Sequence, residues 1–251
     1  MNNDAQYDTY DYSTFWKGRD YEHAADSMVL TELLKKASGK NDCIIDVGGG
    51  LGRLIPYYVD LYKKSIVLDP STVQLKRIQE EVGDRYPTVE YVAGVAETLP
   101  FADSSADTIL CVRVTHHIPD FAVPAKEFHR VLEKDGYLIL EVANKIHFKA
   151  RLQALRKGNY KTLTLADPMA VNADKREGSI DFVNHHPKTL QAILEQAGFE
   201  IVTVRSVSNF RSAVLKKYVP HKLLIAMERA LQRLLASAWF GPSIYFFAHK
   251  K

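Results

Sequence analysis

Closely spaced glycines after a short apolar run form the most informative pattern in this sequence. Residues 44–54 read IIDVGGGLGRL, which places Gly48, Gly50 and Gly52 directly after an expected buried strand. Glycine is needed where the backbone turns sharply or lies against a ligand, and open α/β sheets bind ligands at the carboxyl ends of their strands. Asp46 adds a carboxylate that either contacts a positively charged ligand or orders the loop. We therefore predict a cofactor-binding loop here.

The loop departs from the pattern that binds dinucleotides. The motif G-x-G-x-x-G needs a glycine at its sixth position, where Arg53 stands when the motif is counted from Gly48. The carboxylate of Asp46 would also repel a pyrophosphate at a helix N-terminus. A nicotinamide-dependent oxidoreductase is therefore the less favoured alternative.

Histidines supply most of the other groups that could move a proton. His116 and His117 follow an apolar run, and either one serves as a general base for a hydroxyl nucleophile or merely orders the loop. His147, His185 and His186 are expected near the same cleft. His185 and His186 lack further ligands at metal-binding spacing, so we expect no metal. Without a G-x-S-x-G motif, we also expect no hydrolase nucleophile.

The elements that must position these residues alternate between apolar strands and amphipathic helices. Apolar runs without polar alternation, separated by helices, indicate a parallel sheet that is covered on both faces. Strands are expected at 43–47, 65–68, 89–92, 108–114, 137–142, 199–207 and 244–248. Helices are expected at 22–37, after Ser71, from Pro124, at 187–198 and at 220–237, with Leu223, Leu224, Met227, Leu231, Leu234 and Leu235 facing inward. Residues 144–186 show no clean period.

Several motifs together resemble one family. DVGGGLG at 46–52 resembles the first motif of class I S-adenosylmethionine-dependent methyltransferases. The other resembling segments are YSTFWKGRDY at 12–21, GVAETLPF at 94–101, CVRVTHHIPD at 111–120 and EFHRVLEKDGYLIL at 127–140. The resemblance covers roughly residues 10–143, and the most similar subgroup is the small-molecule methyltransferases of the ubiquinone and menaquinone biosynthesis type.

This resemblance implies a fold and a domain organisation. The fold is α/β and Rossmann-like, the class I methyltransferase fold, with a seven-stranded mostly parallel sheet, an antiparallel last strand and helices on both faces. The chain is then a single methyltransferase domain over 1–251. Residues 1–38 form its N-terminal segment and first helix, and residues 144–186 form a cap-like insertion over the acceptor site.

The resemblance also implies a cofactor, S-adenosyl-L-methionine, whose product is S-adenosyl-L-homocysteine. Asp69 would bind both ribose hydroxyls, unless it only caps the following helix. The residues implied in cofactor binding are Trp16, Arg19, Asp46, Gly48, Gly50, Gly52, Asp69, Pro70, Ala96, Glu97, Cys111 and Arg113. Tyr21 would close over the cofactor together with Trp16 and Arg19, and Arg19 would meet its carboxylate or else lie at the surface. Arg113 either reaches the cleft or forms an ion pair at the end of the sheet.

One position departs from the family pattern. Val95 stands where the family has an aspartate that often receives the adenine amino group. Adenine must therefore be bound by backbone, by Ala96 and Glu97, or by water. The implied reaction is methyl transfer to a small molecule, with an aromatic or lipid-like acceptor favoured. The alternative is a catalytically silent module that binds S-adenosylmethionine or a partner.

Composition and charge exclude several other classes. The chain has 251 residues, of which 46% are hydrophobic and 25% charged, which excludes disordered and collagen-like proteins. A net charge of +3 gives no reason to expect nucleic acid. Cys43 and Cys111 lie in apolar runs, the acidic N-terminus is unlike a signal peptide, and no run is long enough to span a membrane. We therefore expect a cytoplasmic protein.

Positive charge is concentrated toward the C-terminus. From Arg205 onward, nine basic residues accompany a single acidic residue, Glu228, which gives this segment a net charge of +8. The basic helix at 220–237 either contacts a membrane surface or an anionic substrate, or it is an ordinary solvated helix face.

Overall fold

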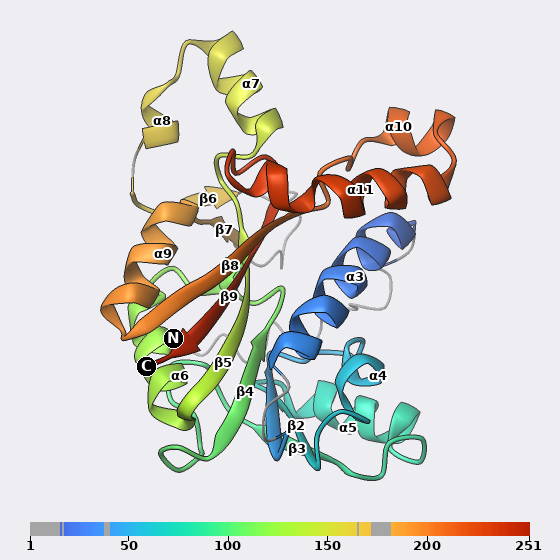
Figure 1. The fold of residues 1–251 in the computed structure, drawn as a ribbon, viewed down its shortest axis with the longest axis vertical. Coiled ribbons are helices and arrows are strands. Elements are labelled where there is room, and N and C mark those ends of the chain that lie inside the picture. Colours follow the sequence, from blue (N-terminus) through green and yellow to red (C-terminus); the bar gives the residue numbers. More distant parts are fainter. Residues whose placement is uncertain (1–15, 17, 38–40, 165, 172–181) are drawn as a thin grey trace.

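A seven-stranded sheet forms the centre of the structure, a computed structural model that describes residues 16, 18–37, 41–164, 166–171 and 182–251 (Figure 1). The strands are β1 (Cys43–Val47), β2 (Lys64–Asp69), β3 (Val89–Ala93), β4 (Ala106–Cys111), β5 (Leu132–Ala143), β8 (Phe199–Val207) and β9 (Ser243–Lys250). Their order in the sheet is β3-β2-β1-β4-β5-β9-β8. Strands β1 to β5 pair in parallel, and β9 is antiparallel to both β5 and β8. The predicted fold, including its antiparallel last strand, is confirmed.

Helices cover both faces of this sheet. One face is packed by α3 (Asp20–Ala37), α4 (Ile55–Tyr58) and α5 (Thr72–Val82), and the other by α6 (Ala122–Val131) and α9 (Pro187–Gln196). Every residue of β1 and β4 is buried. Burial on both faces explains why these strands are continuous apolar runs rather than alternating ones.

Two predicted boundaries differ from the observed ones for local reasons. β4 ends at Cys111 instead of continuing to Val114, because Arg113 has a φ of +66°, which strand backbone does not adopt. α6 begins at Ala122, two residues before Pro124. Proline is tolerated in the first turn of a helix, where its missing N–H has no intrahelical partner to lose.

The predicted inward face of the basic C-terminal helix is confirmed at Leu224 and wrong at Leu223 and Leu234. α11 (His221–Ala236) buries Leu224, Glu228, Gln232 and Ala236, whereas Leu223 and Leu234 are 51% and 68% exposed. The inner face contains polar residues because Glu228 accepts hydrogen bonds from the Tyr21 hydroxyl of α3 and from the side chain of Gln232. These bonds fix the rotation of the helix and leave part of its leucine side open to solvent.

The segment 144–186 contains more regular structure than its sequence indicated. Its described elements are α7 (Phe148–Lys157), α8 (Lys161–Thr164), β6 (Met169–Val171) and β7 (Phe182–Asn184), the last two paired antiparallel. Two backbone hydrogen bonds, from His185 to Ala143 (2.8 Å) and from Lys145 to His185 (3.0 Å), fix the segment to the carboxyl end of β5. In Figure 1, α7 and α8 extend outward from that end of the sheet.

Candidate functional site

The glycine loop after β1 takes a backbone path that only glycine allows. Gly48 has a φ of +70°, and a Cβ there would lie 2.3 Å from Cγ2 of Val114. Its N–H donates to the carbonyl of Leu68 on the neighbouring strand at 2.7 Å. Gly50 also has a positive φ, +52°, but a Cβ there would meet only a backbone oxygen within 4 Å. The loop therefore closes tightly against the sheet at Gly48 and offers bare backbone to a ligand at Gly50.

Asp69 ends β2 directly beside this loop. One carboxylate oxygen accepts from the N–H of Gly50 at 3.0 Å and the other from the N–H of Ser71 at 2.9 Å. Ser71, not Asp69, caps α5, because its hydroxyl accepts from the N–H of Gln74 at 3.1 Å. The alternative role of Asp69 as a helix cap is therefore excluded, and its carboxylate lies in the cavity wall.

Asp46 lies under the loop and is almost fully buried. Only 1% of its surface is exposed, and the Tyr58 hydroxyl donates to its carboxylate at 3.1 Å. Burial raises the pKa of Asp46 to about 7, since a low-dielectric site disfavours the charged form. Its charge therefore changes across neutral pH at the base of the cavity.

The segment that carries Val95, Ala96 and Glu97 forms a third part of the wall. Arg130 of α6 holds this segment in place by donating to the carbonyls of Leu99 at 3.1 Å and Phe101 at 2.9 Å. Val95, which stands where the family pattern has an aspartate, lines the cavity with an apolar side chain. Val95 is 41% exposed.

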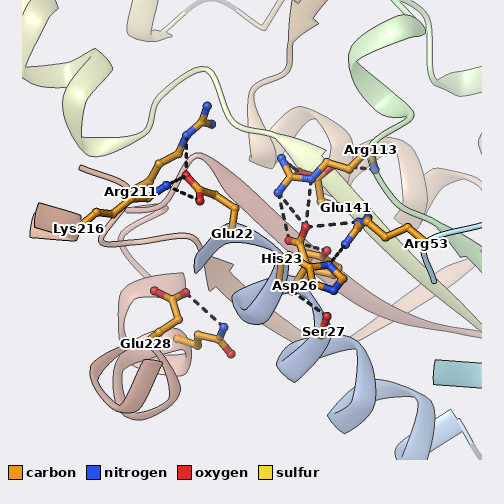
Figure 2. A network of polar contacts seen from close by, with 12 residues as sticks. Glu22, His23, Asp26, Ser27, Arg53, Arg113, Glu141, Arg211, Lys216 and Glu228 are labelled. Atoms are coloured by element: carbon orange, nitrogen blue, oxygen red, sulfur yellow. Dashed lines mark hydrogen bonds and ion pairs between the residues drawn. The ribbon is translucent and has the colours of Figure 1, made fainter. Parts of the chain in front are cut away.

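Two arginines that line the cavity, Arg53 and Arg113, converge on Asp26 of α3 (Figure 2). Arg113 pairs with the fully buried carboxylate of Asp26 at 3.0 Å, and Arg53 approaches it at 3.5 Å. The guanidinium of Arg53 also lies 4.0 Å from the ring centroid of Trp16, a cation–π distance. The Tyr245 hydroxyl of β9 donates to Asp26 as well, at 3.0 Å.

This arrangement joins the two roles considered for Arg113. It lines the cavity and also forms an ion pair at the end of the sheet. Glu141 of β5 lies near the same guanidinium, 4.0 Å away. Because a buried carboxylate without a partner is costly, Asp26 and the two arginines form one structural unit.

An aromatic wall, made by the rings of His116, His117 and Phe182, lines another part of the cavity. The rings of His116 and His117, in the short 3-10 helix Thr115–His117, lie 4.0 Å apart between centroids, and Phe182 of β7 lies 4.9 Å and 5.1 Å from them. Burial lowers the pKa of His117 to about 4. Burial, together with the neighbouring His117 and Arg113, lowers the pKa of His116 well below its usual range. Both imidazoles are therefore neutral at physiological pH.

The other three histidines of the predicted cluster have structural roles. His147 and His186 cap α7 and α9 by accepting backbone N–H bonds. His185 is 3% exposed and bonds through its ring to the carbonyl of Thr115 at 2.9 Å. None of the three lines the described cavity.

The glycine loop, the end of β2, the segment around Ala96 and the rings of His116, His117 and Phe182 line one cavity of about 290 Å³. The predicted residues that line it are Trp16, Asp46, Gly48, Gly50, Asp69, Pro70, Ala96, Glu97, Arg113, His116 and His117. Three other predicted residues, Arg19, Gly52 and Cys111, do not line it. Cys111 is a fully buried core residue, because it belongs to β4 rather than to the loop after it. Gly52 packs against Ile55 instead, and a Cβ at Gly52 would lie 2.8 Å from Cδ1 of Ile55.

Tyr21 also lies elsewhere than expected. It is 2% exposed, its hydroxyl bonds to Glu228 of α11, and it does not line the cavity, so it does not close over a ligand there.

Arg53, Gln74 and Phe182 are among the lining residues that were not predicted from the sequence. Arg53 could have been predicted as a lining residue from the sequence, since it directly follows Gly52, the last glycine of the loop. Phe182 could not, because its strand lies in the segment without a clean period.

Two features are absent from the described ranges. Among the helices in these ranges, none has the length and hydropathy that a bilayer-spanning segment requires. The same ranges hold no cluster of three or more His, Cys, Asp or Glu side chains that could ligate a metal ion.

Comparisons with known proteins agree with the geometry. Residues 45–140 match the family model described as a methyltransferase domain. The chain is 30% identical over 132 residues to the uncharacterized methyltransferase YcgJ of Bacillus subtilis, an alignment that covers 49% of this chain and spans about half, 49%, of that relative. It is 23% identical over 175 residues to the ubiquinone/menaquinone biosynthesis C-methyltransferase UbiE of Marinomonas sp., covering 66% of this chain and 70% of the relative.

A solved structure extends the comparison over nearly the whole chain. An S-adenosylmethionine-dependent methyltransferase of Thermotoga maritima superposes with a TM-score of 0.59 at 19% identity, covering 99% of each chain. At that identity the likeness establishes the fold alone. Residues 45–140 thus match a methyltransferase domain, and the whole chain has the fold of the class I S-adenosylmethionine-dependent methyltransferases.

Proposed function

We propose that this protein transfers a methyl group from S-adenosylmethionine to a small-molecule acceptor, with an aromatic or lipid-like acceptor favoured. The observation that carries the proposal is a single cavity that joins the glycine loop and Asp69 to an aromatic wall. One end suits a nucleoside with a charged tail, and the other suits a flat apolar molecule.

The cofactor end of the cavity fits S-adenosylmethionine. Gly50 leaves space where any other residue would project a side chain into the cavity. Asp69 is fixed by two backbone N–H groups, and a carboxylate accepts about four hydrogen bonds, so it can serve the loop and a ribose together. Arg53 and Arg113 suit the carboxylate of the cofactor, and Asp46 suits its cationic groups.

The chemistry requires little of the protein beyond alignment. When bound, S-adenosylmethionine supplies a methyl group that its positive sulfur already activates for in-line transfer. Phe182, Ile118 and Trp16 give the cavity apolar walls that orient an acceptor and exclude water. A neutral imidazole at His116 or His117 can accept the proton of an acceptor hydroxyl, and we assign this general-base role to His117 or His116.

The acceptor class rests on the aromatic wall and on one relative. UbiE is named for ubiquinone and menaquinone biosynthesis and for C-methylation, which supports a lipid-like acceptor for this chain. We include residues 144–186 in the acceptor site, because β7 contributes Phe182 to the wall. Peripheral membrane contact through α11 and a cytoplasmic location, the latter supported by the buried free thiols of Cys43 and Cys111, are parts of the same proposal.

The test is a calorimetric titration with S-adenosylhomocysteine, with NADH in parallel. We expect micromolar binding of the first and no binding of the second. Labelled methyl transfer from S-adenosylmethionine to phenols, quinols and lipids then tests the acceptor class. NADH binding alone would overturn the proposal in favour of an oxidoreductase, and S-adenosylhomocysteine binding without transfer to any acceptor would favour the silent module.

The raised pKa of Asp46 predicts how cofactor affinity depends on pH. Only the ionised carboxylate attracts a cationic ligand, and its pKa of about 7 means that ionisation increases across neutral pH. The affinity for S-adenosylmethionine should therefore rise by up to about tenfold between about pH 6 and pH 8. Isothermal titration at several pH values measures this slope, and Asp46→Asn should remove it. An equal slope in the Asn variant would contradict the assignment.

The same pKa shift has the opposite sign for stability without ligand. The folded chain holds the Asp46 proton more tightly than the unfolded chain, so this stabilisation is complete below the usual aspartate pKa and is lost as pH rises toward about 7. Ligand affinity and ligand-free stability should therefore change in opposite directions across this range.

A further inference from the structure

Helix α7 exposes the face that an amphipathic helix normally buries. Phe148, Leu152 and Leu155 follow the i, i+4, i+7 spacing of one helix face, and they are 49%, 36% and 54% exposed. The buried residue of α7 is instead Ala154, on another face. Phe148 also stacks on Phe240 of the body of the protein, so the open part of the stripe is at Leu152 and Leu155, and it indicates a surface that packs against something else.

Charge indicates what that surface meets. Residues 145–166, which include α7 and α8, contain six basic residues and no acidic residue. Arg156, Lys157 and Lys161 are exposed near the apolar stripe, and Tyr160 is 53% exposed between them. Leucine and phenylalanine on one face, with lysine and arginine beside them, are typical of helices that lie in the interface of an anionic membrane.

The outward position of α7 is fixed by contacts at its base. The Nζ of Lys149 donates to the carbonyl of Arg211 at 2.6 Å, and the guanidinium of Arg151 donates to the carbonyl of Trp239 at 3.1 Å. The ring of Phe148 stacks on Phe240 at 4.9 Å between centroids. These contacts hold the first turn, and the remaining turns extend from the carboxyl end of the sheet (Figure 1). Residues at the carboxyl ends of β1 and β2 line the cavity, so it lies at the same end of the sheet.

Two other occupants fit the surface less well. A second copy packed on the same face would oppose one acid-free basic segment to another, and like charges across an interface repel. An acidic protein would satisfy the basic residues but gives no reason for a stripe of Phe148, Leu152 and Leu155. We propose that α7 and α8 dock on an anionic phospholipid surface. This inference deepens the proposed function and rests on its lipid-like acceptor, which the docked protein would meet at the bilayer.

The test is flotation of the full-length protein with vesicles of phosphatidylcholine and phosphatidylglycerol, compared with phosphatidylcholine alone. We expect binding to the anionic vesicles only, and weakening by added salt. Leu155→Glu should reduce binding about tenfold or more, as should the double substitution Arg156→Gln with Lys157→Gln. The matched controls are Leu61→Glu, at an exposed leucine that precedes the amino end of β2, and Lys76→Gln with Arg77→Gln on α5. Both controls should bind like the unchanged protein.

Each other outcome overturns the inference. No binding to either vesicle, equal binding to both, or equal losses in the control variants would each exclude docking through α7. Binding of an acidic protein but not of vesicles would assign the surface to that partner instead. S-adenosylhomocysteine titration of the same preparations separates the two proposals, because docking can fail while the cofactor still binds, whereas loss of cofactor binding in the unchanged protein would contradict the proposed function itself.

Discussion

Replacing Asp26 with alanine is expected to lower the free energy of unfolding by about 3 kcal/mol or more. The substitution leaves the largely buried side chains of Arg113 and Arg53 without their shared carboxylate and removes the acceptor of the Tyr245 hydroxyl. Loss of one partner of a buried pair costs more than the pair contributes, because the remaining charge stays in a low-dielectric site. Urea unfolding followed by fluorescence measures the change.

Two comparisons make this prediction specific. Asp60→Ala, at an exposed aspartate after α4, should change stability by less than about 0.5 kcal/mol. The double variant Asp26→Ala with Arg113→Ala should lose less than the sum of the two single variants, because each single substitution already breaks the same ion pair. Additive losses, or a loss below about 1 kcal/mol for Asp26→Ala, would show that the pair is not a structural unit.

Replacing Asp69 with alanine is expected to weaken S-adenosylhomocysteine binding about 100-fold. The substitution removes the carboxylate proposed to bind the ribose, and hydrogen bonds to charged groups contribute about 1.5–3 kcal/mol each. It also frees the N–H groups of Gly50 and Ser71, which the carboxylate now holds. Calorimetric titration measures the loss directly.

Asp69→Asn distinguishes the two contributions. The amide keeps one acceptor oxygen but loses the charge, so we expect an intermediate loss of about tenfold. Thermal unfolding of both variants without ligand reports any general damage to the fold. Unchanged affinity in Asp69→Ala, with normal unfolding, would rule out Asp69 as a ligand contact.

The parts of the site that sequence predicted correctly depend on local rules. The glycine loop was recognisable because positive φ angles require glycine at Gly48 and Gly50. Asp69 was recognisable because it ends an apolar strand, and a strand end in a parallel sheet is where ligands bind. The order of strands and helices followed from burial on both faces, which the runs of apolar residues record directly.

The parts that sequence missed depend on distant partners. Leu223 and Leu234 of α11 were expected inside, but Glu228 takes the inner face because Tyr21, 207 residues away, donates to it. A hydrogen bond between residues so far apart does not alter the hydrophobic periodicity of either segment, so the sequence pattern does not reveal it. Hydrophobic periodicity assumes an apolar interior, and α11 packs partly through hydrogen bonds instead.

The position of β9 has a consequence for how the protein is made. β9 is the last strand of the chain, yet it lies between β5 and β8, and its Tyr245 bonds to Asp26, 219 residues earlier. During synthesis, α3 is made long before β9. The bond between Asp26 and Tyr245 can form only after the 219 residues that follow Asp26 have been made. The segment 45–140, although it carries the family match, therefore lacks the partners that complete its own cavity. Contacts this far apart in sequence make completion of the site a late and slow step of folding.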